Sequence, residues 1–312
     1  MANAFIFPGQ GCQKEGMGKD LYDKFPYSRK YFEIANQILG WNITDIMFNG
    51  SEEDLMQTKN TQPSVFIYEV ALAETQNSVK PDLVAGHSLG EFAALVVAGV
   101  ISYEDGLKLV YHRALYGQEA CDKYPTAMGA VIGLTDDYVN KRIKEIWEET
   151  GEPIYFANFN GPGQVVISGS KKGVRMACKA FKNEGAKKAV PLAIGGSFHT
   201  PYMNEAKEKL AKIIENTTFK NPRIPVVQCV DALPHTDPIL IKNNLIEHIT
   251  HPVLWTDMVI NMVNEVINTF YEVGTDDTLE KIVKRMYPDK TVMSLLDIPE
   301  YNGVIKNYKI IN

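Results

Sequence analysis

A serine between two glycines is the residue of this sequence best suited to nucleophilic chemistry. The segment Gly86-His87-Ser88-Leu89-Gly90 matches G-x-S-x-G, in which small residues permit a tight strand-to-helix turn that exposes the serine hydroxyl. The first amides of the following helix would face an oxyanion formed there. The serine could instead be an ordinary helix N-cap. An apolar strand pattern (DLVAGHS) before it and an apolar helix pattern (LGEFAALVVAGVI) after it favour the nucleophile.

A serine nucleophile needs a base, and the chain has six histidines. His87 is adjacent in sequence, but its side chain should leave the turn in another direction. His199 lies in a glycine-rich turn, GGSFHTPYM, that could bring an imidazole over the end of a distant strand. His248 and His251 could share a helical face as metal ligands. No third ligand follows nearby, so we expect a capping or surface role for both and predict no metal site.

An arginine among apolar residues is the candidate for anion binding. Arg113 lies in LVYHRALYGQEA, and a planar guanidinium can hold a carboxylate through two hydrogen bonds. Two phosphate-binding patterns fail. A P-loop in GCQKEGMGKD would need glycine at Gln13 and serine or threonine at Asp20. GQGCQK has Lys14 where a dinucleotide fingerprint needs its third glycine. We therefore expect a substrate with a free acid group and no cofactor.

The elements that would position these residues alternate between strands and helices. Strands are expected at NAFIFPGQG, DLVAGHS, IPVVQCV and NTFYEVG, with helical patterns between them, which is typical of an α/β layer. Residues 127–193 follow the order β-α-β-β-α-β of a ferredoxin-like unit. We predict an α/β fold with a large hydrolase-like domain at 1–126 and 194–312, built on a short parallel sheet, and an inserted ferredoxin-like subdomain at 127–193.

Composition and charge limit the class of protein. At 312 residues the chain is long for a single core, and 45% apolar with 22% charged residues is ordinary for a globular protein. A net charge of -6, with lysines scattered among acids, predicts no nucleic-acid or membrane partner. The sequence has no bilayer-length apolar run and no basic leader, so we expect a cytoplasmic protein. Its four cysteines form no CxxC pair and should be reduced. A monomer is the default expectation.

A series of longer segments follows in a fixed order along the chain: FPGQGCQKEGMGKDLY, TQPSVFIYEVALAE, AGHSLGEFAALVVAGVIS, LVYHRALYGQEA, NFNGPGQVVISG, GGSFHTPYM and HPVLW. This ordered series resembles the malonyl-CoA:acyl carrier protein transacylases and the acyltransferase domains of polyketide synthases. The similarity extends from about residue 4 to residue 285. This set is far more specific than G-x-S-x-G alone.

The resemblance implies a catalytic pair in place of a triad. Ser88 would be the nucleophile and His199 the general base and acid. A main-chain carbonyl near His248 would orient the imidazole. The main-chain amides of Gln10 and Leu89 would form the oxyanion hole.

The resemblance also implies the acyl pocket. Arg113 would bind the malonyl carboxylate, with Gln62 and Asn160 lining the pocket nearby. Phe198 matches the malonyl-selective form of its motif. Gly117 departs from the family, which often has methionine there, and could widen the pocket. A second departure is GTDDTLEKI at 274–282, where the family usually has GPGKVLTGL; it adds acid where a lysine is common.

The implied reaction is transfer of malonyl from malonyl-CoA to the phosphopantetheine thiol of holo acyl carrier protein, for fatty acid synthesis. A free-standing polyketide acyltransferase and an acyl-thioester hydrolase with the same pair are alternatives, as is a catalytically silent scaffold that binds carrier protein. A generic esterase would need Ser, Asp and His in chain order, for which Asp231 before His235 or His248 offers itself.

Overall fold

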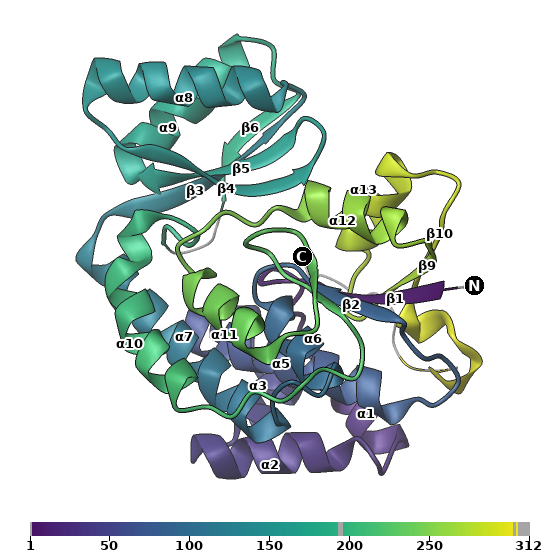
Figure 1. Cartoon of the computed structure of the whole chain (residues 1–312). Helices are drawn as coiled ribbons and strands as arrows, with labels where there is room; N and C mark the ends of the chain where they lie inside the picture. Colours follow the sequence, from purple (N-terminus) through teal and green to yellow (C-terminus); the bar gives the residue numbers. More distant parts are fainter. Residues whose placement is uncertain (1, 193–195, 302–303, 305–312) are drawn as a thin grey trace.

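Two β-sheets organise the chain in the computed structural model, which describes residues 2–192, 196–301 and 304 (Figure 1). The larger sheet has six strands in the order β10-β9-β1-β2-β7-β8. All neighbouring strands are parallel except β7 and β8, which are antiparallel. The strands are β1 (Ala2–Phe7), β2 (Leu83–Gly86), β7 (Val226–Val227), β8 (Pro234–His235), β9 (Ile267–Glu272) and β10 (Thr291–Ser294).

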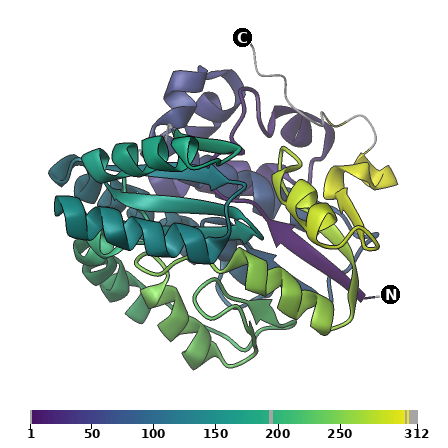
Figure 2. The ribbon, with the colours of Figure 1, turned by 90° about the horizontal axis from the view of Figure 1, so that it is seen from above.

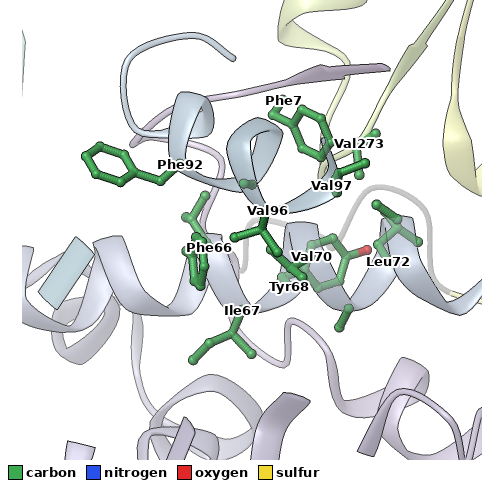
Figure 3. Close-up of a cluster of buried hydrophobic side chains, with 14 of the residues drawn as sticks. Phe7, Phe66, Ile67, Tyr68, Val70, Leu72, Phe92, Val96, Val97 and Val273 are labelled. Atoms are coloured by element: carbon green, nitrogen blue, oxygen red, sulfur yellow. The ribbon is translucent and has the colours of Figure 1, made fainter. Parts of the chain in front are cut away.

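Helices pack on both faces of this sheet. One core joins α5, α6 and α7 with the N-terminal helices, and a second lies under α12 and α13. Figure 3 shows part of the first core, where side chains of α5 and α6 pack beside Phe7 and Val273. These helices are α1 (Lys19–Lys24), α2 (Arg29–Leu39), α3 (Ile43–Asn49), α4 (Glu52–Met56), α5 (Thr58–Thr75), α6 (Gly90–Val97), α7 (Tyr103–Lys123), α10 (Asn204–Glu215), α11 (Pro238–Glu247), α12 (Trp255–Asn264) and α13 (Thr278–Met286). Short 3₁₀ turns occupy Pro201–Met203, Leu295–Asp297 and Pro299–Tyr301.

The smaller sheet is antiparallel, with strand order β4-β5-β3-β6. Two adjacent helices cover one of its faces (Figure 2) and share a separate hydrophobic core with it. The other face carries Met128 and Val166, which pack with Phe198 in a further cluster. The elements are β3 (Thr126–Ile132), α8 (Asp136–Thr150), β4 (Ile154–Gly161), β5 (Gln164–Ser170), α9 (Lys171–Asn183) and β6 (Lys188–Pro191).

Local signals explain where several helices begin and end. Thr135 and Ser102 accept hydrogen bonds from the first turns of α8 and α7, as their hydroxyls predict. Gly151 ends α8 in the left-handed conformation at φ 71°, which glycine adopts without steric cost. The strand expected at IPVVQCV is shorter than its apolar run, because only Val226 and Val227 pair with neighbours.

Three sequence expectations differ from the structure or fall outside it. His248 was expected to have a capping or surface role. It is the C-cap residue of α11, which confirms the first role, but the surface role is wrong because its side chain is 1% exposed and lies in the core. α5 lies in one of the expected helical patterns, but it is buried on all sides from Asn60 to Ala73 and not on one face, because α6, α7 and the N-terminal helices surround it. The domain boundary at 193/194 lies outside the described residues. Among the described residues, no helix combines the length and apolar character needed to span a membrane.

One residue of α5 leads to a stability prediction. Both carboxylate oxygens of Glu69 are buried and have no hydrogen-bond partner in the described part of the chain. Burial, followed by the charges of Glu272 and Asp276, raises the pKa of Glu69 well above its ordinary value of 4.5. The folded chain therefore keeps a proton that the unfolded chain releases. The free energy of unfolding should fall as pH rises above the unfolded pKa, by up to about 1.4 kcal/mol per pH unit from this group.

We expect Glu69→Gln to flatten this pH dependence and to be the more stable protein at pH 8, because the amide never ionises. Urea unfolding of both proteins from pH 5 to pH 8 measures the effect. Glu272, whose pKa is raised to about 8 chiefly by burial, is present in both proteins and leaves a residual pH dependence in each. Parallel curves for the two proteins would mean that Glu69 ionises freely in the folded chain.

Candidate active site

Ser88 lies on a sharp turn between β2 and α6 and has a left-handed backbone, with φ 53°. The glycines on either side are required by close packing. A Cβ at Gly86 would lie 2.0 Å from the carbonyl carbon of Gly90, and a Cβ at Gly90 would lie 2.2 Å from the carbonyl oxygen of Phe7. The turn thus fits tightly against β1, and the serine hydroxyl projects beyond the carboxyl end of the parallel strands.

The Ser88 hydroxyl bonds to side chains of distant segments. Its Oγ is 2.6 Å from Nε2 of His199, and Nη2 of Arg113 donates to the same oxygen at 3.2 Å. The N-cap of α6 is Leu89, and no described side chain caps that helix. The hydroxyl is therefore in contact with a base and a cation, and does not serve as the N-cap that the sequence left open.

The imidazole of His199 is held by two main-chain carbonyls. Its Nδ1 lies 3.1 Å from the carbonyl oxygen of His248 and 3.0 Å from that of His251. Carbonyl oxygens only accept, so Nδ1 carries the hydrogen and Nε2 presents a lone pair to Ser88. Burial, followed by the positive charge of Arg113, lowers the pKa of His199 to about 3. The ring is thus neutral and can accept the serine proton. The His251 carbonyl was not anticipated from sequence.

Two main-chain amides near the hydroxyl are free. No described group accepts a hydrogen bond from the N–H of Gln10, which follows β1, or from the N–H of Leu89, which begins α6. Gln10 and Ser88 line the same cavity. A pair of unused donors at a nucleophile, one of them at a helix N-terminus, is the arrangement that stabilises an oxyanion.

Arg113 on α7 brings a buried positive charge to the cavity. Its side chain is 2% exposed, and Nη1 donates to Oε1 of Gln62 at 2.8 Å. Nε has no hydrogen-bond partner in the described part of the chain. Burial lowers the pKa of Arg113 to about 10, so the group stays protonated at neutral pH. Gln62 was expected to line the pocket, but it is fully buried behind the guanidinium and fixes its position.

The cavity in front of Ser88 has a volume of about 250 Å³ and lies between the two sheets. Met128, Asn160 and Val166 of the smaller sheet form one wall, and the start of α13 forms another. Asn160 lines the cavity as predicted, and its Oδ1 bonds to Nε2 of His87 at 2.8 Å. His87 is thus bonded to Asn160 and not to the Ser88 hydroxyl. Asp276 also lines the cavity. It belongs to residues 274–282, where the sequence differs from the usual family pattern.

The alternative esterase triad does not assemble. Asp231 bonds to His235 at 2.8 Å and to Asn244 at 2.9 Å. In the described part of the chain, His199 is the histidine bonded to the Ser88 hydroxyl. The Asp231–His235 pair follows β7 and serves local structure.

Gly117 does not widen the acyl pocket, because an aromatic ring occupies the space that a larger residue would fill. A Cβ built on Gly117 would lie 2.6 Å from Cζ of Phe198. The same ring lies 5.0 Å from the guanidinium carbon of Arg113, within the range of a cation–π contact. Gly117 on α7 thus lets Phe198 pack against the arginine.

We expect Gly117→Ala to slow acylation and to destabilise the protein by about 1–3 kcal/mol, although alanine favours helices over glycine. The added methyl would push the Phe198 ring toward Arg113 and the cavity. A double-mutant cycle tests the clash. It compares the free energy of unfolding in urea of four proteins: the wild type, Gly117→Ala, Phe198→Leu and the double variant. The double variant should recover part of the loss because the leucine side chain is shorter. Simple additivity of the two single effects would contradict the proposed clash.

Comparison with known proteins agrees with this geometry. The family model of the acyl transferase domain matches residues 4–302. The malonyl CoA-acyl carrier protein transacylase of Bacillus subtilis is 37% identical, over 91% of this chain and 90% of the relative. The enzyme of the same name from Escherichia coli K12 is 38% identical, over 94% of this chain and 95% of the relative. The chain therefore belongs to the malonyl CoA-acyl carrier protein transacylase family.

Solved structures agree. The malonyl CoA-acyl carrier protein transacylase of Coxiella burnetii superposes with a TM-score of 0.92 at 34% identity, covering 98% of each chain. A malonyl-transacylase in complex with a type II polyketide-synthase acyl carrier protein superposes with a TM-score of 0.89 at 36% identity, covering 94% of this chain and 95% of that one.

Proposed function

We propose that this protein transfers malonyl groups from malonyl-CoA to the phosphopantetheine thiol of acyl carrier protein, supplying malonyl units for fatty acid synthesis. The observation that carries the proposal is the contact of one hydroxyl with both a neutral imidazole and a buried guanidinium, at 2.6 Å and 3.2 Å. The first group activates the nucleophile, and the second selects an acyl chain that ends in a carboxylate. Family membership supports the same reaction.

The first half-reaction would acylate the serine. Nε2 of His199 takes the hydroxyl proton as Oγ of Ser88 attacks the thioester carbonyl carbon. The amides of Gln10 and Leu89 stabilise the tetrahedral oxyanion. When the carbon–sulfur bond breaks, the imidazolium returns its proton to the leaving thiolate. The products are free coenzyme A and malonyl-Ser88. Throughout, the guanidinium of Arg113 holds the malonyl carboxylate.

The second half-reaction would run the same steps in reverse. The thiol of the carrier protein gives its proton to His199 and attacks the ester carbonyl of malonyl-Ser88. The tetrahedral intermediate expels Oγ, which recovers the proton from the imidazolium. The carrier protein leaves as its malonyl thioester, and the kinetics are ping-pong. The carbonyls of His248 and His251 keep the imidazole in one tautomer during both halves.

We also propose the division of the chain into a hydrolase-like domain at 1–126 and 194–312 and a ferredoxin-like subdomain at 127–193. The element order β3-α8-β4-β5-α9-β6, the strand order β4-β5-β3-β6 and the separate core beneath α8 and α9 support the smaller unit. Ser88 at the end of a parallel strand supports the larger one. The cytoplasmic location and the monomeric state stay predictions.

Intact-protein mass spectrometry tests the proposed reaction. The protein is mixed with malonyl-CoA or acetyl-CoA, and holo acyl carrier protein is added afterwards. We expect a malonyl adduct that exceeds the acetyl adduct, and its movement to the carrier protein. Apo carrier protein, which lacks the phosphopantetheine thiol, is the matched control and should leave the adduct on the enzyme. An adduct that decays to free malonate before carrier protein is added would indicate a hydrolase, and no adduct would indicate a scaffold.

A further inference from the structure

Three side chains with metal-binding atoms meet directly beneath the catalytic pair. They are Glu91 on α6, Cys229 after β7, and His248 at the end of α11, and each is at most 1% exposed. One carboxylate oxygen, Sγ and one imidazole nitrogen lie within 4.8 Å of one another. Among the described residues this is the one such group of three. None of the three lines the cavity at Ser88.

The imidazole of His248 presents an unused nitrogen to this group. Its Nε2 is buried, lies 3.9 Å from Oε2 of Glu91, and has no hydrogen-bond partner in the described part of the chain. The ring also has a main-chain hydrogen bond with Ser88, which must involve Nδ1. Since a carbonyl accepts that bond, Nδ1 carries the hydrogen and Nε2 has a bare lone pair. A buried acceptor without a donor costs about 1–3 kcal/mol, unless something else binds it.

The other two groups are held in place by a second layer of hydrogen bonds. Oε1 of Glu91 accepts from Nε2 of Gln228 at 3.0 Å, and Oε2 accepts from the main-chain N–H of Cys229 at 2.8 Å. Gln228 is in turn bonded to Asn244. The Cys229 thiol donates to the carbonyl oxygen of Gly86 at 3.1 Å. Outer hydrogen bonds of this kind orient ligands at metal sites.

We propose that Glu91, Cys229 and His248 bind a divalent transition-metal ion, with zinc as the ion that best fits a sulfur, nitrogen and oxygen donor set. On binding, Cys229 releases its thiol proton to solvent, and the thiolate and carboxylate neutralise the two positive charges of the ion. Tetrahedral bonds of about 2.0–2.3 Å place ligand atoms about 3.3–3.7 Å apart. The 3.9 Å separation of Nε2 and Oε2 is close to this value, and Sγ of Cys229 lies within 4.8 Å of the imidazole nitrogen.

Such an ion would have a structural role next to the chemistry. It would tie α6, the segment after β7 and the end of α11 together, and the His248 carbonyl that orients His199 belongs to one of the three ligands. None of the three ligands lines the cavity, so the ion would lie behind the catalytic pair and out of contact with the substrate. The proposal is independent of the acyl transfer itself.

Metal binding is tested on the full chain. Because the site is buried, the protein is unfolded with a chelator and refolded with Co²⁺ or Zn²⁺, and bound metal is counted by elemental mass spectrometry after gel filtration. We expect one ion per chain and, for Co²⁺, a thiolate-to-cobalt charge-transfer band. The melting temperature should rise in proportion to the logarithm of free metal concentration. X-ray absorption of the wild-type zinc protein should show one sulfur with nitrogen and oxygen donors, a measurement that needs no variant.

Variants locate the ligands. Cys229→Ser should abolish the charge-transfer band, and His248→Gln should weaken binding at least about tenfold. Cys178→Ser, which removes a buried thiol of α9, is the matched control and should keep the band. A refolded wild type without stoichiometric metal would overturn the proposal. The approach of Nε2 of His248 to Glu91 would then be explained by a protonated Glu91 carboxyl group. Persistence of the band in folded Cys229→Ser would also overturn it.

Discussion

Ser88→Ala should form no covalent adduct with malonyl-CoA, and the rate of malonyl transfer should fall by at least about 10⁴-fold. The reason is that Oγ is the atom aligned with the Nε2 lone pair of His199 at 2.6 Å. Removing the nucleophile of such a pair leaves only the stabilisation provided by the oxyanion donors and by substrate binding. Intact mass after mixing with malonyl-CoA, together with steady-state transfer to holo carrier protein, measures both effects.

Ser102→Ala is the matched control, because Ser102 is a serine that only caps a helix. Its side chain accepts from the N–H of Asp105 at the start of α7. Its loss should cost about 1 kcal/mol of stability and leave the adduct intact. If Ser88→Ala still acquired one malonyl group, another side chain would be the nucleophile, and peptide mapping of the adduct would identify it.

Arg113→Ala should lower kcat/KM for malonyl-CoA by about 10²–10³-fold while changing the value for acetyl-CoA far less. A carboxylate held in two charge-assisted hydrogen bonds gains about 1.5–2 kcal/mol from each. Acetyl lacks this group and gains nothing from the guanidinium. For Arg113→Lys, kcat/KM for malonyl-CoA should lie between the values of the wild type and Arg113→Ala, because an ammonium group keeps the charge but lacks the planar shape of the guanidinium. Competition of the two thioesters for Ser88, followed by mass spectrometry, gives the ratio directly.

Arg142→Ala supplies the control for loss of an arginine elsewhere. Arg142 lies on α8 and pairs with Glu184 at 3.0 Å, away from the cavity. Its removal should leave the ratio of malonyl to acetyl adduct unchanged. An unchanged ratio in Arg113→Ala would show instead that malonyl selectivity comes from the shape of the cavity, and Phe198 would become the residue to test.

The sequence predicted many of the helices and strands around the site well, because these depend on local pattern. The strand before Ser88, the helix after it and the caps of α7 and α8 follow from periodicity and from single hydroxyl groups. The meeting of Ser88 with His199 could not be obtained that way, since 111 residues separate them. The family resemblance proposed the pairing, and the catalytic roles themselves stay predictions.

What the sequence missed depends on packing between distant segments. Glycine at position 117 suggested extra space in the acyl pocket. The ring of Phe198 fills that space, because the turn after β6 packs directly against α7. The sequence paired His248 only with His251 as a possible metal ligand, and it did not single out Cys229. The approach of His248 and Cys229 to Glu91 depends on how α11 and the segment after β7 are placed against α6. No local pattern contains that information.

The left-handed backbone of both members of the catalytic pair restricts how this protein can change in evolution. Ser88 has φ 53° and His199 has φ 63°, a region that β-branched residues hardly enter. Threonine would keep a hydroxyl at position 88 but would resist the turn that presents it. Replacement of Ser88 by threonine is therefore disfavoured, although threonine serves as a nucleophile in other proteins. The main chain at position 88 therefore disfavours the β-branched hydroxyl residue independently of the chemistry at the site.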